Sequence, residues 1–191
     1  MQLHELHPAL VHLPIALLPA SLAADAAGMH DAGRAGIALT AGSAALAAAS
    51  GLIAQEEVET DEVSHDLLAT HRTLNIGVLG ATVAMALHRA GRERPGPGYL
   101  ALGLAAVGVT MYSAYLGGRM VYAHGVGVEP AGGLEPDHAP PVEDASAGAL
   151  LRRIGHDLRH GLQHTFEHLR EGDVVPAITR SRTTPLDADD A

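Results

Sequence analysis

Four long apolar stretches constrain the fold of this 191-residue chain more than any other feature of its sequence. An α-helix needs roughly 20 residues to cross the hydrocarbon core of a bilayer, and each stretch is close to that length. We interpret them as membrane-spanning helices over residues 8–27, 35–54, 71–88 and 99–117. The sequence therefore predicts an all-α protein whose main part is a four-helix transmembrane bundle.

The composition agrees with a membrane location. Aromatic residues make up only 3% of the chain, although 47% of its residues are hydrophobic. Small residues are useful in a bilayer, because helices there associate through close backbone approach and van der Waals packing. The second stretch carries no charged residue and consists largely of Ala, Gly and Ser. We expect it to pack against other helices.

Charge and cysteine content exclude several functions. The formal net charge is −10 and all twelve basic residues are Arg, so a Lys-rich surface for nucleic acid is absent. The chain has no Cys, which excludes disulfides, thiolate zinc sites, iron–sulfur clusters and covalently attached c-type haem. No HExxH motif or nucleophile elbow indicates hydrolytic catalysis. A metal or haem would therefore depend on ligands such as His.

The distribution of Arg predicts the orientation in the membrane. Arg34 lies between the first two stretches, and Arg89, Arg92 and Arg94 follow the third. Residues 55–62, between the second and third stretches, include no Lys or Arg. By the positive-inside rule the Arg-bearing loops are cytoplasmic, so both termini are expected on the outer side.

The sequence changes character after residue 128. Residues 129–148 are rich in Pro, Gly and acidic side chains and predict a flexible linker, and residues 173–191 predict a disordered tail. Between them, residues 149–172 predict an amphipathic helix that lies on the membrane surface or against the bundle. A His stripe with a four-residue spacing suggests metal chelation, and its alternative is a pH-sensitive polar face. The stripe comprises His156, His160, His164 and His168.

Histidines also gather near the outer ends of the predicted spans. His12 is the strongest candidate ligand, because it lies more than one turn inside the first span, where an imidazole without a function is costly. His71 is the second candidate, and Asn75 lies one turn further along the same face. Glycines after residue 116 predict a tight turn that folds His124 back over the bundle. The remaining members of the group are His4, His7, His65 and His138.

Three motifs resemble a known family. They are HPALVHLPIAL from His7, HRTLN from His71 and GGRMVYAHGVGV from Gly117. Together they resemble the DUF2231 family of predicted bacterial membrane proteins, over roughly residues 5 to 128. The resemblance implies a four-helix membrane domain with His-rich outer ends. Together with the Arg distribution it leads us to expect a protein of the bacterial inner membrane with both termini periplasmic. Some members are fused to cytochrome c-like domains, but the family name assigns no activity.

Two imidazoles from different membrane helices can hold a b-type haem. We expect His12 and His71 as its axial ligands, and His7 and His124 as alternatives or as hydrogen-bond partners of propionates or a quinol. Electron transfer between a quinol and a c-type cytochrome would suit such a protein.

Further residues and alternatives complete the sequence-based hypotheses. Arg72 and Arg119 lie at the same predicted depth, where they can pair with propionates. One alternative is a zinc or copper site formed by the same imidazoles. Another is a cofactor-free structural or assembly subunit of a membrane complex.

Overall fold

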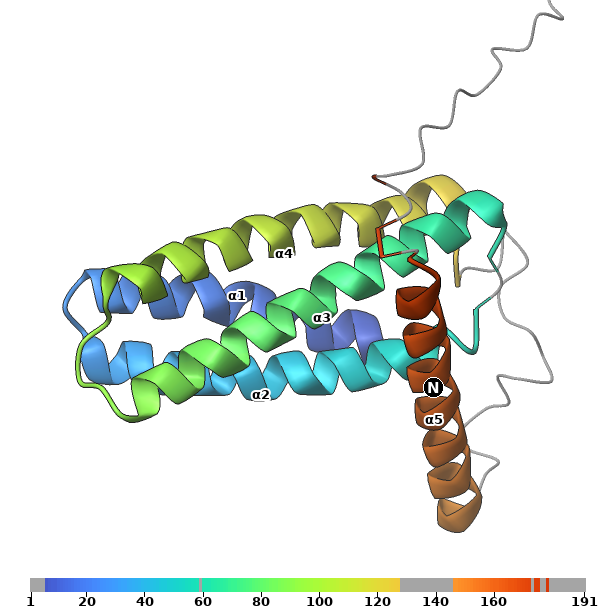
Figure 1. Ribbon diagram of the computed structural model, residues 1–191. Coiled ribbons are helices and arrows are strands. Elements are labelled where there is room, and N and C mark those ends of the chain that lie inside the picture. The colour runs from blue at the N-terminus through green and yellow to red at the C-terminus, as the bar shows by residue number, and fades with distance from the viewer. Residues whose placement is uncertain (1–5, 59, 128–145, 173, 176–177, 179–191) are drawn as a thin grey trace, which may run out of the picture.

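Five α-helices make up the chain in a computed structural model that describes residues 6–58, 60–127, 146–172, 174–175 and 178 (Figure 1). The predicted all-α class is confirmed. The predicted linker and tail fall almost entirely outside the described residues, as do His4 and His138. The helices are α1 (Leu6–Ala26), α2 (His30–Ala54), α3 (Glu62–Ala90), α4 (Pro97–His124) and α5 (Ala147–Glu171).

The first four helices lie side by side in alternating directions, and α5 crosses the end of α2 (Figure 1). Neighbours in the chain contact each other and α1 also contacts α4, so α1 faces α3 across the bundle. One end of the bundle carries His7 and His71 and is called the histidine end below. The opposite end carries Asp25 and Arg89 and is called the arginine end.

Three helices, α1, α2 and α4, are long and apolar enough to cross a membrane. Helix α3 was predicted as a fourth span and has 29 residues, but it does not reach the same hydropathy. The polar side chains of α3 lower its mean hydropathy. Several of them face the neighbouring helices and not the outside of the bundle. Thr70, Thr82 and Arg89 of α3 are fully buried.

Two helix ends differ from the sequence-based expectation. Helix α4 continues through Gly117 and Gly118 to His124, so the predicted turn at these glycines is wrong. The helix ends instead at Gly125, whose left-handed conformation has φ of 66° and whose N–H bonds to Val121 O. The intervening residues keep helical hydrogen bonding, and a glycine at the C-terminal cap is the common way to end it.

Helix α3 begins at Glu62, before the predicted start of the span at residue 71. Asp61 caps it, because its carboxylate accepts hydrogen bonds from the Ser64 hydroxyl and from Ser64 N–H, the latter at 2.7 Å. These bonds stabilise the charged carboxylate and lower the pKa of Asp61. The early start adds His65 to the helix.

The two helical hairpins repeat one pattern of buried positions. Four buried positions of α3 lie 64 residues after a buried position of α1, as Arg89 does after Asp25. Six of the seven buried positions of α4 lie 66 residues after a buried position of α2, as Ser113 does after Ala47. The matched pairs in α1 and α3 are Pro14 with Val78, Leu18 with Thr82, Ser21 with Met85, and Asp25 with Arg89. The bundle is therefore two similar hairpins related by an approximate two-fold axis.

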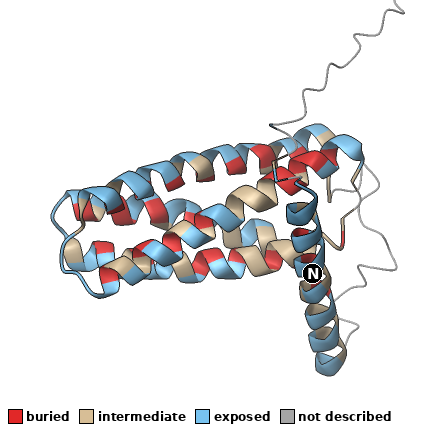
Figure 2. Cartoon of the chain, in the orientation of Figure 1, coloured by how far each residue is buried: buried red, intermediate tan, exposed pale blue. Residues whose placement is uncertain are grey.

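The buried core runs along this axis (Figure 2). Leu18, Leu22, Ile37, Met85 and Tyr99 form its larger apolar cluster, towards the arginine end. A smaller cluster lies towards the histidine end and consists of Leu67, Leu116 and Met120. Buried small residues bring the helices close together, as expected for helices that pack in a membrane.

A buried ion pair joins the hairpins at the arginine end. Arg89 Nη2 donates to Asp25 Oδ1 at 2.8 Å, and neither side chain is exposed. The same nitrogen donates to His30 O at 2.8 Å, and His30 Nδ1 lies 3.5 Å from Asp25 Oδ1. A Cβ at Gly33 would lie 2.4 Å from Asp25 Cγ, so this glycine makes room for the carboxylate.

Removing one member of this pair should destabilise the bundle strongly. We expect Arg89→Met to cost about 3–5 kcal/mol, because it leaves the Asp25 carboxylate buried without its partner. Thermal unfolding of the protein in mild detergent measures the loss. Because the two positions are equivalent, the double variant Asp25→Arg with Arg89→Asp should recover part of the lost stability. An unchanged melting temperature in Arg89→Met would contradict the assigned role.

Candidate histidine site

His7 and His71 occupy equivalent positions of the two hairpins and meet across the bundle. His71 lies 64 residues after His7, the same spacing that relates Asp25 to Arg89. Their ring centroids are 6.3 Å apart, and the ring planes are perpendicular. The approximate two-fold axis thus passes between two imidazoles at one end of the bundle and between two opposite charges at the other.

The His7 ring is fixed by the neighbouring helix α2. His7 Nδ1 lies 2.9 Å from the carbonyl oxygen of Ala47 and 3.3 Å from Ser50 Oγ. A carbonyl oxygen only accepts hydrogen bonds, so His7 Nδ1 carries the proton. When the ring is neutral, His7 Nε2 keeps its lone pair, which is the arrangement found in metal-binding histidines.

The His71 ring is fixed in the same way by α4. His71 Nδ1 lies 2.8 Å from Ser113 O and 3.0 Å from Ser113 Oγ. The carbonyl again requires the proton on Nδ1, so Nε2 is the acceptor. Asn75 Nδ2 donates to this Nε2 at 3.0 Å and to His71 O at 2.9 Å. The sequence spacing had placed Asn75 one turn from His71 on the same face of the helix.

A glycine of the partner helix lies against each ring. A Cβ at Gly51 would lie 2.9 Å from His7 Cε1, and a Cβ at Gly117 would lie 3.3 Å from His71 Cε1. The two glycines are themselves equivalent, because they are 66 residues apart in α2 and α4. Both imidazoles therefore pack closely against the backbone of the partner helix. Each half of the site is formed within one hairpin.

The structure does not bring His12 to His71. His12 is exposed on α1, and His7 takes the place beside His71 that we expected for it. Five residues separate His7 from His12, which turns the second side chain by about 140° around the helix. A membrane helix is apolar on all sides, so its sequence gave no signal for which of the two histidines faces inward.

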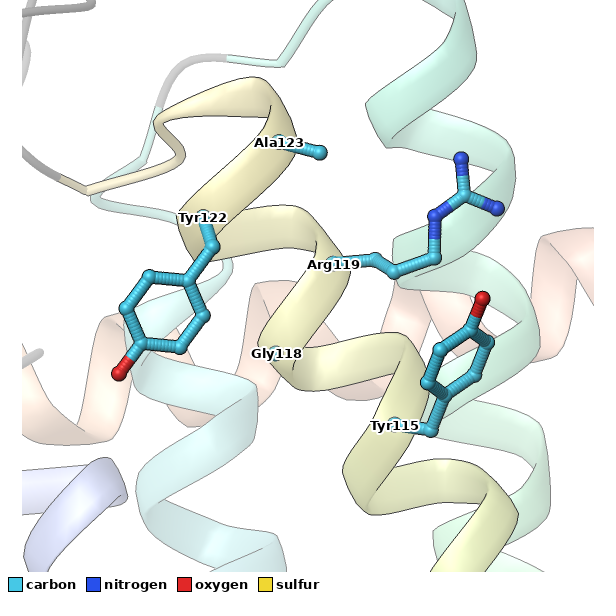
Figure 3. Close-up of a pocket in the computed structure, with 5 residues that line it drawn as sticks. All are labelled: Tyr115, Gly118, Arg119, Tyr122 and Ala123. Carbon is cyan, nitrogen blue, oxygen red and sulfur yellow. The ribbon is translucent and has the colours of Figure 1, made fainter.

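The other predicted residues lie around this pair without forming one group. Arg72 is half-buried, and its Nη1 donates to Gln55 Oε1 at 3.0 Å. Arg119 is exposed on α4, in an open groove that also contains Tyr115 and Tyr122 (Figure 3). His124 is partly buried at the end of α4, and its Nε2 has no hydrogen-bond partner among the residues that the structure describes.

The four histidines of α5 have different neighbours. His156 and His160 stack with ring centroids 4.1 Å apart. His164 Nδ1 lies 3.1 Å from Glu56 Oε1 at the end of α2, and the His168 ring lies 5.2 Å from that of His65. Within the described part of the chain, no group of three or more His or acidic side chains is arranged to hold a metal ion.

Together these features define an α-helical membrane protein with a half-buried histidine pair at one end of its bundle. The model of the predicted membrane protein family DUF2231 matches residues 3–130, and the chain belongs to this family. The suspected family is thereby confirmed. Neither curated proteins nor solved structures gave a match.

Adding a methyl group at Gly51 should disturb the site. We expect Gly51→Ala to cost about 1–3 kcal/mol, because the new Cβ overlaps the His7 ring. Gly42→Ala is the matched control on the same helix, since nothing lies within 4 Å of its Cβ. The control should gain up to about 1 kcal/mol from helix propensity. Thermal unfolding compares the two variants, and equal effects would contradict the close packing of His7.

Proposed function

We propose that this protein binds haem b through His7 and His71 and carries electrons in the membrane. The observation that supports the proposal is the facing pair of imidazoles, each with Nδ1–H held by a carbonyl of the partner helix. Two imidazoles that bind one metal centre from opposite sides, at about 2 Å, have ring centroids about 6 Å apart. The measured separation of 6.3 Å is compatible with that arrangement.

The number of protein ligands favours haem over a bare metal ion. A structural zinc ion takes four ligands from the protein, and a catalytic one takes three. Haem iron takes only one or two axial ligands, because the porphyrin supplies the other four. A pair of histidines therefore suffices for haem, whose iron supplies one-electron chemistry when it is bound.

The residues around the pair have distinct roles in this proposal. Ala47 O and Ser113 O hold the rings in one tautomer and orientation, which increases the basicity of the ligating nitrogens. Asn75 would release His71 Nε2 to the iron while keeping its bond to His71 O. Arg72 and Arg119 are the candidates for pairing with propionates.

The same proposal includes the membrane arrangement. Helix α3 serves as the fourth span, because its length and position match those of its neighbours. Arg34, Arg92 and Arg94 lie at the arginine end, and the positive-inside rule favours the cytoplasm for them. The histidine end then faces the periplasm of a bacterial inner membrane. A quinol is the proposed electron donor and a c-type cytochrome the proposed acceptor.

Spectroscopy of the purified protein tests the haem proposal. We expect reduced α and Soret bands at stoichiometric haem after dithionite addition in mild detergent. His7→Ala and His71→Ala should each lose the bis-histidine spectrum, and the double variant should lose the haem. His12→Ala is the matched control on α1 and should keep it, because His12 is exposed and away from the pair.

Other results would contradict this assignment. Loss of haem in His12→Ala but not in His7→Ala would return the role to His12. A colourless protein that contains stoichiometric zinc or copper would favour a metal site, such as the α5 histidines. A protein with neither would favour a structural or assembly role.

Labelling with a membrane-impermeant maleimide tests the orientation, because the chain has no Cys. Glu93→Cys lies in the loop before α4, and Glu171→Cys lies at the end of α5. In spheroplasts we expect Glu171→Cys to be labelled and Glu93→Cys to be protected until the cells are permeabilised. The reverse pattern would invert the topology, and labelling of both would show that the chain crosses the membrane differently.

A further inference from the structure

Helix α5 presents an apolar face that the bundle does not cover. Leu151 and Phe166 are 70% and 64% exposed, and Leu162 and Leu169 are also exposed. At about 100° per residue these four side chains lie on one side of the helix. They are called the apolar face of α5 below.

A different side of α5 docks on the bundle. Asp157, Gly161 and Thr165 are its buried residues and recur one turn apart. A Cβ at Gly161 would lie 2.8 Å from Leu52 O, so the helices approach closely there. Docking therefore leaves the apolar face available for another partner.

The contacts of α5 show which way the apolar face is turned. His164 and Arg153 pair with Glu56 and Glu57, which follow the end of α2. Gly161 faces Leu52, which lies about one turn before Glu56 and so closer to the middle of the bundle. The side of α5 that carries His164 therefore faces the turn after α2, and the side that carries Gly161 faces the membrane-spanning part of α2.

Leu162 lies further around α5 in the same rotational direction, from His164 through Gly161. It follows Gly161 by about 100°, whereas His164 lies about 60° to the other side of Gly161. The apolar face is therefore turned towards the body of α2, a helix long and apolar enough to span a membrane. Figure 1 shows α5 crossing the end of α2 rather than running along it, which is the direction of a membrane surface.

Arginines border the apolar face on its other side. Arg152, Arg159 and Arg170 are exposed. They lie between the apolar face and the side of α5 that carries His156. An amphipathic helix in a membrane interface has such an edge, where guanidinium groups reach lipid phosphates while the apolar side chains enter the acyl region.

We propose that α5 is an interfacial helix that binds the phospholipid surface of the membrane that the bundle spans. The apolar face inserts below the headgroups, and the three arginines bind their phosphates, with a preference for anionic lipid. The bundle fixes the height and direction of α5 through Gly161, the ion pair of Arg153 with Glu57 and the contact of His164 with Glu56. This surface does not depend on whether the histidine pair binds haem.

A single tryptophan tests the proposal directly, because the chain contains none. Phe166→Trp places the reporter in the apolar face, and Gln163→Trp places it on the exposed polar side of the same helix. Both full-length variants are reconstituted in nanodiscs of phosphatidylcholine, or of equal parts phosphatidylcholine and phosphatidylglycerol. Part of the lipid carries brominated acyl chains, which quench only nearby tryptophan. Leu151→Trp repeats the measurement at the other end of the apolar face.

We expect the Phe166→Trp emission to shift to shorter wavelength and to be quenched by brominated lipid, more so with phosphatidylglycerol present. Gln163→Trp should emit at longer wavelength and be quenched by aqueous acrylamide. Acrylamide quenching of both variants would overturn the proposal, because the apolar face would then contact water. Protection of Phe166→Trp from both quenchers would overturn it too, since protein rather than lipid would cover the face. Equal quenching in the two lipid mixtures would overturn the preference for anionic lipid.

Discussion

The ion pair between Asp25 and Arg89 is the contact on which the arrangement of the two hairpins depends. Both side chains are fully buried at the arginine end, where an unpaired charge would be very unfavourable. Each belongs to a different hairpin, so the charges are compensated only when α1 and α3 face each other in this register. The carbonyl of His30 and the absence of a side chain at Gly33 complete the local arrangement.

This register has a consequence at the opposite end of the bundle. Helices α1 and α3 both run from the histidine end to the arginine end, and equivalent residues meet across the axis. The pairing of Asp25 with Arg89 therefore goes together with the pairing of His7 with His71, at the same spacing of 64 residues. One end holds two opposite charges, and the other holds two imidazoles whose Nδ1 atoms contact backbone carbonyls. The hairpins are similar in packing but supply different chemistry at their two ends.

Helix α3 illustrates how tertiary contacts change the meaning of a polar sequence. Its hydropathy does not reach that of its neighbours, although it lies among them along the bundle. Arg89 donates to the Asp25 carboxylate, Arg72 donates to the Gln55 side chain, and Thr70 donates to Asp66 O in its own helix. Polar groups that face partners in the bundle interior are tolerated at membrane depth, whereas the same groups facing lipid would not be.

The sequence by itself determined the all-α class, the apolar stretches, the family and the position of Asn75 on the same helix face as His71, because these follow from local composition, spacing and motifs. It did not determine that His7 rather than His12 meets His71, that α4 continues through Gly117 and Gly118, or that Asp25 pairs with Arg89. Those features depend on which side of each helix faces inward. In helices that are apolar on nearly every side, the sequence carries little information about that choice. Packing between the hairpins decided which side of each helix faces inward, through small residues at the contacts and the compensation of buried polar groups.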